Sequence, residues 1–136
     1  ERRMLYSTTG TEERRLETVM TGPELISIQR LVRQIPVPDK VVEAILSLVR
    51  SARPGTSPET EVDRYVAWGP GPRASQALML AVRAKALIDG RLAPSVDDVI
   101  ALAEPILKHR MALKFAARAD NQDLSGIIAR LAAKAG

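Results

Sequence analysis

Apolar residues recur at helical spacing in one segment after another of this chain, and prolines, glycines and capping residues separate those segments. The signals that start a helix stand at Thr21, Asp39, Pro72, Ser95 and Asp123. Only the stretch from Val62 to Trp68 has an extended or irregular character, and no set of alternating runs forms a convincing sheet. The pattern predicts an all-α fold, a small bundle of five or six helices with short extended connectors.

The chain divides into a short arm and a helical domain. Its 136 residues suffice for one domain, and a composition of 46% hydrophobic and 26% charged residues is that of a globular protein. Residues 1–22 show no sustained apolar period, so we expect a connector or arm there and a helical domain over residues 23–136. Because the sequence starts at Glu1 without a methionine, we expect the chain to be a piece of a longer protein.

Residue types that are missing from the sequence exclude several kinds of site. The chain has no cysteine, which excludes disulfides, thiolate metal sites and cysteine nucleophiles. A cysteine-free chain fits a reducing compartment, and we expect a cytoplasmic protein. The single histidine, His109, cannot supply the ligands of the usual zinc sites. No apolar run approaches the length of a membrane span. No nucleophile and base stand together, so we predict no catalytic residue and no metal site in this chain.

The positive charge does not form a nucleic-acid footprint. The net charge of +4 is spread along the chain among acidic residues, and aromatic residues, which could stack on bases, make up only 3%. The one local basic cluster consists of Lys108, His109, Arg110, Lys114 and Arg118. Cations are favourable near a helix C-terminus, so we interpret His109 and its neighbours as helix-end capping. A basic DNA-binding helical domain is therefore kept only as a third hypothesis.

The stretch from Gly69 to Ala74 is the most informative part of the sequence. Gly69, Gly71 and Ala74 match the G-x-G-x-x-A pattern of dinucleotide-binding loops. Such a loop binds phosphate through backbone N–H groups, and Pro70 and Pro72 have none. The chain also lacks the further strands of a parallel sheet, so we reject the dinucleotide interpretation.

Helix geometry favours a different interpretation of the same stretch. Pro72 suits the first position of a helix, and the small side chains that follow form a ridge that would let another helix approach closely: Ala74, Ala77, Ala81, Ala84 and Ile88. Arg73 is expected beside this ridge, on the side that faces the body of the protein. A cation at a helix N-terminus is unfavourable unless an anion lies beside it. Three interpretations of Arg73 follow: it holds an anion such as phosphate, it pairs with Glu61 or Asp63, or it merely lies along the surface.

An extended segment followed by G-x-x-P-R-A and a long Ala/Leu helix resembles the C-terminal helical lid of an AAA+ ATPase of the MoxR type. Leu25–Arg53 resembles the first two lid helices, with the family's arginine after the second. Leu87–Asp98 is similar to the family's L-x-G-R-x-x-V-x-P-x-D-V connector, and Pro105–Arg110 to its P-V-L-R-H-R. The resemblance covers residues 23–136, with one departure: the usual G-A-S-P-R is here Gly-Pro-Gly-Pro-Arg.

In lids of this type the arginine that starts the third helix is the sensor-2 residue, which touches the nucleotide phosphates. The resemblance therefore implies that Arg73 is sensor 2, that Gly69, Gly71 and Pro72 position it, and that Glu1–Leu5 end an ATPase core. It implies ATP and Mg²⁺ in the intact protein. The implied partners are the protein's own AAA+ core, neighbouring subunits of a ring, expected to be a hexamer, and protein clients of a chaperone-like activity.

Two ATPase motifs are missing from the sequence. No G-x-x-x-x-G-K-[ST] loop is present to hold phosphates, and no apolar run ends in Asp-Glu to hold magnesium and water. We therefore expect that this chain alone binds no cofactor and does not hydrolyse ATP. The second hypothesis is a helical protein–protein interaction module, with the Ala ridge and the C-terminal helix as docking surfaces and Arg73 in a structural role.

Overall fold

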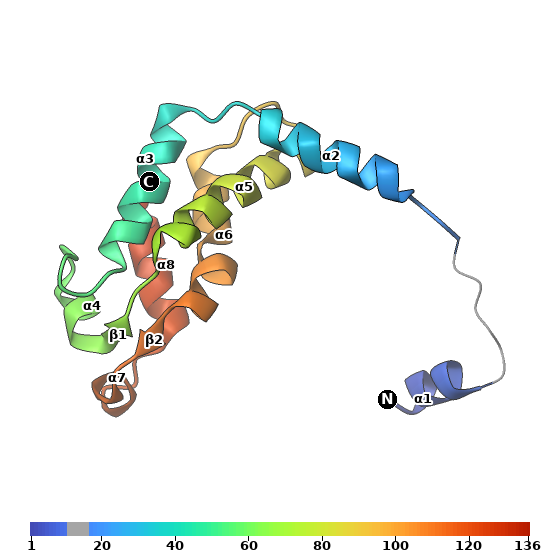
Figure 1. Cartoon of the computed structure of the whole chain (residues 1–136). Coiled ribbons are helices and arrows are strands. Elements are labelled where there is room, and N and C mark those ends of the chain that lie inside the picture. Colours follow the sequence, from blue (N-terminus) through green and yellow to red (C-terminus); the bar gives the residue numbers. More distant parts are fainter. Residues whose placement is uncertain (11–16) are drawn as a thin grey trace.

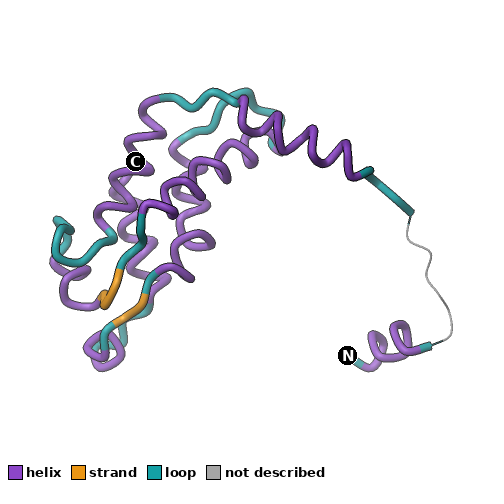
Figure 2. Tube along the Cα trace, viewed as in Figure 1, coloured by secondary structure: helices purple, strands orange, loops and turns teal. Residues whose placement is uncertain are grey.

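The computed structural model describes residues 1–10 and 17–136 and is mostly helical over these ranges (Figure 1). In chain order the elements are α1 (Arg2–Thr9), α2 (Gly22–Gln34), α3 (Asp39–Ser51), α4 (Thr60–Tyr65), β1 (Val66–Trp68), α5 (Pro72–Ile88), α6 (Val96–Leu107), the 3₁₀ turn η1 (Lys108–Arg110), β2 (Ala112–Leu113), α7 (Phe115–Ala119) and α8 (Leu124–Ala135). The predicted helical fold with short extended connectors is confirmed (Figure 2).

Helices α3, α5, α6 and α8 form the bundle around one core, in which α3 and α6 each pack on the other three helices. Each contributes branched or long apolar residues that are almost completely excluded from solvent. The largest of them are Ile45, Leu48, Leu78, Leu107, Ile127, Ile128 and Leu131. Burial of such aliphatic side chains is the main source of stability in a chain with so few aromatic residues.

Helix α2 projects from this bundle and touches it chiefly through α5 (Figure 1). None of its residues is buried, and Leu25, Ile26 and Leu31 are each about half exposed, at 48%, 50% and 46%. The first buried residue after it is Ile35, which is 7% exposed and ends the helix. This helix is therefore held at its C-terminal end only.

The predicted helix starts at Thr21, Ser95 and Asp123 are confirmed as N-caps. Thr21 and Glu24 form a capping box on α2, and Ser95 and Asp98 form one on α6. The Asp123 carboxylate accepts the N–H of Gly126 at the start of α8. Each of these caps satisfies backbone donors that an α-helix leaves without partners.

The predicted cap at Asp39 is wrong by one residue. The N-cap of α3 is Pro38, with φ −63° and ψ 145°, and Asp39 is the first helical residue. There its carboxylate lies near the positive end of the helix dipole, which is a favourable place for an anion.

Short elements depart most from the sequence-based expectation. The structure has eight α-helices over the described residues, and the helices that the sequence did not predict are α1, α4 and α7, of eight, six and five residues. Helices this short show too few apolar turns for a period to be recognised. The predicted arm over residues 1–22 thus contains α1, none of whose residues is buried, while its residues 11–16 lie outside the described ranges.

The expectation of no sheet is also wrong, although the sheet is very small. β1 and β2 pair in antiparallel fashion, with Val66 opposite Leu113 and Trp68 opposite Ala112. Strands of three and two residues carry no alternation that a sequence pattern could show. Over residues 1–10 and 17–136 no helix has the length and apolarity needed to cross a bilayer.

Candidate functional site

The turn between β1 and α5 carries the stretch that the sequence singles out. Pro72 is the first residue of α5, as predicted, and Gly71 is its N-cap. Proline fits there because the N–H that it lacks would have no helical partner at that position. Gly71 has no side chain, so no side-chain oxygen caps the helix, and the first turn of α5 contains no acidic residue. The positive end of this helix dipole therefore faces outward without a compensating anion from its own turn.

Gly69 lies directly against the end of α3. A Cβ atom at this position would lie 2.3 Å from the carbonyl oxygen of Ala52 and 2.8 Å from the Cα of Arg53. Real Cβ atoms do not approach backbone atoms so closely, so any side chain at position 69 must displace the turn. The Nε–H of Arg53 donates a hydrogen bond to the carbonyl oxygen of Pro70 at 2.8 Å. The turn is thus fixed to α3 by close packing and by one hydrogen bond.

Gly71 has no comparable constraint. A Cβ atom there would meet nothing within 4 Å, and its φ of −80° and ψ of −178° are extended backbone that any residue adopts. Of the two glycines predicted to position Arg73, only Gly69 has a steric reason to be glycine.

Arg73 is exposed, so the expectation that it faces the body of the protein is wrong. The face of α5 that enters the core is formed by residues four apart, beginning at Ala74: Ala74, Leu78, Val82 and Ala86. Arg73 precedes the first of these by one residue, a rotation of about 100°. Its side chain therefore leaves the helix away from the core.

The alternative partners proposed for Arg73 are bonded elsewhere. The carboxylate of Glu61 accepts two hydrogen bonds from Nε of Arg130, at 3.2 and 3.0 Å, and one from its Nη2 at 2.7 Å. The carboxylate of Asp63 accepts the backbone N–H of Gly55 at 2.5 Å. Within the described ranges, no hydrogen bond or ion pair occupies the guanidinium of Arg73.

The small-residue ridge of α5 is divided between two environments. Ala74 belongs to the core, whereas Ala77, Ala81 and Ala84 line an open groove of about 490 Å³ beside Val32 and Arg33 of α2, with Leu80 and Gln29 also lining it. The helix beside the ridge is α2, which contacts α5 and forms the other wall of this groove. The end of the ridge was predicted wrongly, because Ile88 is 84% exposed.

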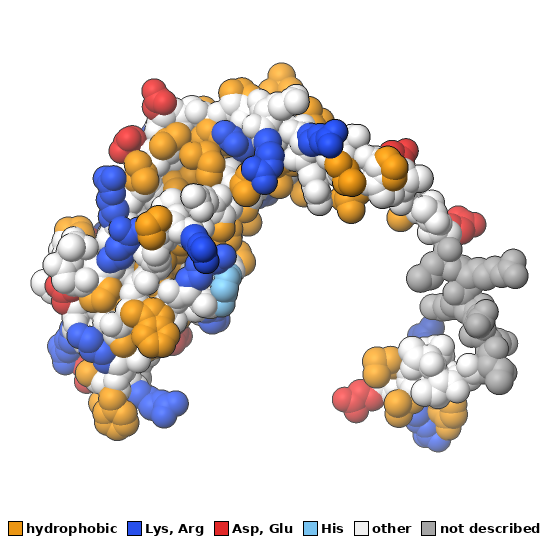
Figure 3. Space-filling view, viewed as in Figure 1, with side chains coloured by type: hydrophobic (Ala, Val, Ile, Leu, Met, Phe, Trp, Pro, Cys, Tyr) orange, Lys and Arg blue, Asp and Glu red, His pale blue; other side chains and the backbone are white. Residues whose placement is uncertain are grey.

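Residues 108–110 are the first part of the basic cluster, and they support the capping interpretation. Helix α6 continues through Pro105 and is followed directly by η1. Nη1 of Arg110 donates a hydrogen bond at 2.7 Å to the carbonyl oxygen of Ile106 in the last turn of α6. Lys108 forms an ion pair with Glu104 at 2.9 Å. Figure 3 shows that Lys and Arg side chains on the displayed face are scattered over several elements.

The connector between α5 and α6 contains an ion pair that sequence reasoning missed. Asp98 is 3% exposed, and both of its carboxylate oxygens accept hydrogen bonds from Arg91, at 2.8 and 2.7 Å. These bonds hold the pKa of Asp98 at about 2, helped by the backbone N–H of Ser95 and opposed by burial. Gly90, which lies just after the end of α5, has φ of +72° and lets the chain turn back toward this pair. Both residues lie in the Leu87–Asp98 stretch that resembles the family's connector, but the sequence pattern did not indicate that they pair.

Metal ligands do not gather in this structure. No group of three or more His, Asp or Glu side chains over residues 1–10 and 17–136 is arranged to hold a metal ion. Over this part of the chain the residues do not fit a magnesium site.

Comparison with models of protein families gives a match over more than half of the chain. A family model described as "AAA lid domain" matches residues 58–130 of this chain. The matched region runs from the start of α4 into α8 and includes the whole of α5 with Arg73.

Two curated proteins are similar to the chain in sequence. "Chaperone MoxR1" of Mycobacterium tuberculosis is 31% identical over 121 residues, which cover 88% of this chain and 32% of that protein. "Uncharacterized protein YeaC" of Bacillus subtilis is 36% identical over 98 residues, which cover 72% of this chain and 28% of that protein. The chain thus spans about a third of the length of these relatives.

One solved structure has the same fold. The crystal structure of a "putative ATPase" from Cytophaga hutchinsonii superposes with a TM-score of 0.82 at 19% identity. The match covers 97% of this chain and 41% of that protein chain.

Proposed function

This chain belongs to the AAA lid domain family and is a lid of the MoxR type. On this basis we propose that Arg73 is its sensor-2 residue and contacts the phosphates of ATP in the intact protein. The observation that carries the proposal is the exposure of the Arg73 side chain and its position at the start of α5. It is an exposed guanidinium at a helix N-terminus that has no acidic residue in its first turn. Both features favour an anion at this place, and arginine is the side chain best shaped to bind phosphate oxygens.

The role requires that the ATPase core of the intact protein cover the exposed Arg73, which the sequence-based prediction had placed against the body of the lid. The phosphates would be held by an ATPase core that is not part of this chain, so a side chain that reaches them must leave the surface of the lid. The turn behind Arg73 is fixed by Gly69 and by the Arg53–Pro70 hydrogen bond. A rigid turn directs the guanidinium without a large loss of backbone entropy when phosphate binds.

The lid would act by closing over bound nucleotide. Arg73 would stabilise charge on the phosphates, and the bundle of α3, α5, α6 and α8 would move as a rigid unit when phosphate is lost. Magnesium and the attacking water belong to the ATPase core in this proposal, because the described residues of this chain do not fit a magnesium site. We further propose a cytoplasmic ring, a hexamer, in which lid rotation reaches neighbouring subunits and acts on protein clients.

The test uses the complete ATPase. Arg73→Ala should lower ATP turnover by about 10²–10³-fold, the usual effect of removing one group that stabilises developing charge. Arg50→Ala is the matched control, because Arg50 is an exposed arginine in the last turn of α3 and its loss changes the net charge equally. Turnover unchanged in the Arg73 variant, or lowered equally in both variants, would contradict the sensor-2 assignment.

An interaction module without a nucleotide role is the second candidate. It is favoured by the exposed apolar residues of α2, which the bundle leaves largely uncovered. This candidate predicts that a partner protein binds the chain with an affinity that is unchanged in Arg73→Ala. The same variant therefore separates the two functions.

A further inference from the structure

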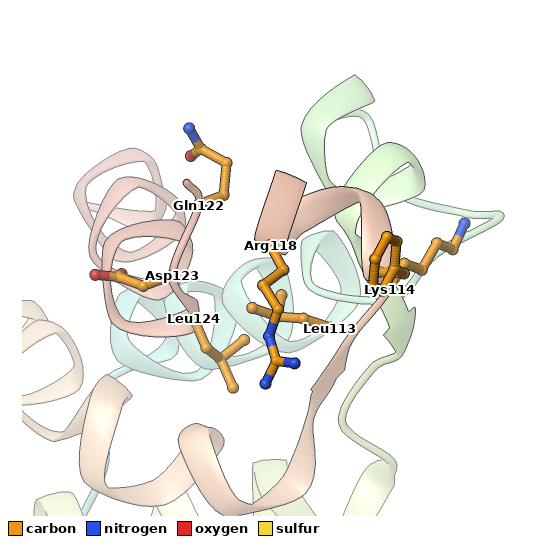
Figure 4. A pocket seen from close by; sticks show the side chains of 7 residues that line it. Leu113, Lys114, Arg118, Gln122, Asp123 and Leu124 are labelled. Atoms are coloured by element: carbon orange, nitrogen blue, oxygen red, sulfur yellow. The ribbon is translucent and has the colours of Figure 1, made fainter. Parts of the chain in front are cut away.

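A pocket of about 470 Å³ lies beside α7, at the end of the domain that also carries the small sheet (Figures 1 and 4). It is lined by Leu113, Lys114, Phe115, Arg118, Gln122, Asp123 and Leu124. Two of these residues, Lys114 and Arg118, belong to the basic cluster that the sequence singled out. The proposed nucleotide role does not involve this pocket.

The polar groups of the pocket are used internally, with one exception. Lys114 donates a hydrogen bond from Nζ to the backbone carbonyl of Asp63 at 2.7 Å. The Asp123 carboxylate caps α8, and the amide oxygen of Gln122 accepts a hydrogen bond from Arg130 at 3.0 Å. Among the described residues no carboxylate or carbonyl group accepts a hydrogen bond from Arg118. Its five N–H donors are therefore free for a partner from outside.

The free guanidinium lies among apolar side chains. Figure 4 shows Arg118 reaching from α7 between Leu113 and Leu124, while Lys114 and Asp123 point away from it. Phe115, which also lines the pocket, is 83% exposed. An exposed cation with apolar side chains beside it suits a ligand that presents a carboxylate next to an apolar side chain.

We propose that this pocket docks a segment of a partner protein in which an acidic residue stands next to a bulky apolar residue. The carboxylate would accept two parallel hydrogen bonds from Arg118, and the apolar side chain would pack on Leu124 and Phe115. The positive charge of Arg118 favours an acidic protein segment over a nucleic acid as the ligand of this pocket. A nucleic acid needs several free cations in a row, and here Lys108, Arg110 and Lys114 already have partners.

A fluorescein-labelled peptide with three Asp-Leu pairs separated by Gly-Ser spacers tests the proposal by fluorescence anisotropy with the 136-residue chain. Arg118→Gln should weaken binding about tenfold or more, because a charge-assisted hydrogen bond is lost. Phe115→Ala should also weaken it, and its high exposure means that the fold does not depend on it. Lys108→Gln is the control with the same change in charge outside the pocket, and should leave the affinity unchanged.

Two companion peptides show which side chains of the ligand the pocket recognises. Replacing every Asp of the probe by Asn, or every Leu by Ala, should each weaken binding. Absence of binding by the parent peptide at millimolar concentration overturns the proposal, as does equal weakening in Arg118→Gln and Lys108→Gln. Tighter binding of a labelled DNA duplex than of the Asp-Leu peptide at the same salt concentration would assign the pocket to nucleic acid instead. Circular dichroism of each variant verifies that the helices are intact.

Discussion

The Nε–H of Arg53 and the carbonyl oxygen of Pro70 lie 2.8 Å apart and join the end of α3 to the turn that precedes α5. The two residues are separated by seventeen positions in the sequence. Pro70 is buried, so its carbonyl oxygen has little access to water as a substitute partner. This hydrogen bond therefore fixes the turn from which Arg73 projects.

Removal of this hydrogen bond should destabilise the fold. In Arg53→Met the aliphatic stem is kept and only the donor is lost, so the free energy of unfolding should fall by about 1–3 kcal/mol, the cost of an unsatisfied buried acceptor. Urea denaturation followed by circular dichroism measures the change. Arg50→Met, at an exposed site near the same helix end, should change it by less than about 0.5 kcal/mol. Equal stability of the Arg53 variant and the parent chain would show that the hydrogen bond is not needed.

The two glycines of the turn should respond in opposite ways to substitution. Gly69→Ala forces a Cβ atom against the backbone of Ala52 and Arg53, so we expect a loss of about 1–3 kcal/mol from overpacking. Gly71→Ser should leave stability unchanged or raise it, because serine is a preferred N-cap and nothing lies within 4 Å of its Cβ position. Thermal unfolding of both variants measures the contrast. A similar loss in both would mean that the close approach at Gly69 is not what makes glycine necessary.

The ion pair between Arg91 and Asp98 should make the free energy of unfolding depend on pH in the acidic range. The pKa of Asp98 is about 2 in the folded chain and about 3.9 in an unfolded one. The pair therefore contributes its full stability above pH 4, and this contribution disappears as the pH falls through 2. We expect about 2 kcal/mol or somewhat less, since the side chain of Arg91 is 37% exposed and partly screened by solvent.

The comparison of Asp98→Asn with the parent chain isolates this effect. The pKa values of Glu24, Asp89 and Glu104 are also lowered by hydrogen bonds, so the parent chain loses stability in acid for several reasons. The difference in unfolding free energy between the two proteins should be large at pH 6 and small at pH 2. Asp97→Asn, an exposed substitution in the same helical turn, supplies the control. A constant difference across this range of pH would contradict the assignment.

Much of this fold could be predicted because its signals are local. A capping box such as Ser95 with Asp98 needs only three residues of spacing, and Pro72 and Gly90 mark the two ends of α5 by their own backbone restrictions. The helices that escaped prediction were the short ones, α1, α4 and α7, which have too few turns for an apolar period to be recognised.

The candidate site was harder to predict because its geometry depends on contacts between distant segments. Gly69 and Gly71 look alike in the sequence, and only the position of Ala52 distinguishes them. The direction of Arg73 was predicted wrongly for a related reason. The ridge of alanines suggested a buried face next to it, whereas the core lies along Ala74 and Leu78. Residue types thus predicted an anion site at Arg73, whereas the packing of α5 determines the direction in which this side chain points.

A double-mutant cycle in the complete ATPase should show whether Arg53 acts through Arg73. If the proposed function holds and Arg53 is a positioning residue, Arg53→Met lowers ATP turnover in the parent protein because the sensor-2 side chain loses its place. The same substitution should then have an effect of less than about twofold when Arg73→Ala is already present, because no guanidinium remains to be positioned. Multiplicative loss in the double variant would mean that Arg53 affects turnover by a separate route. Arg53→Lys should restore only part of the turnover, since a lysine ammonium does not reproduce the Nε–H geometry that holds Pro70.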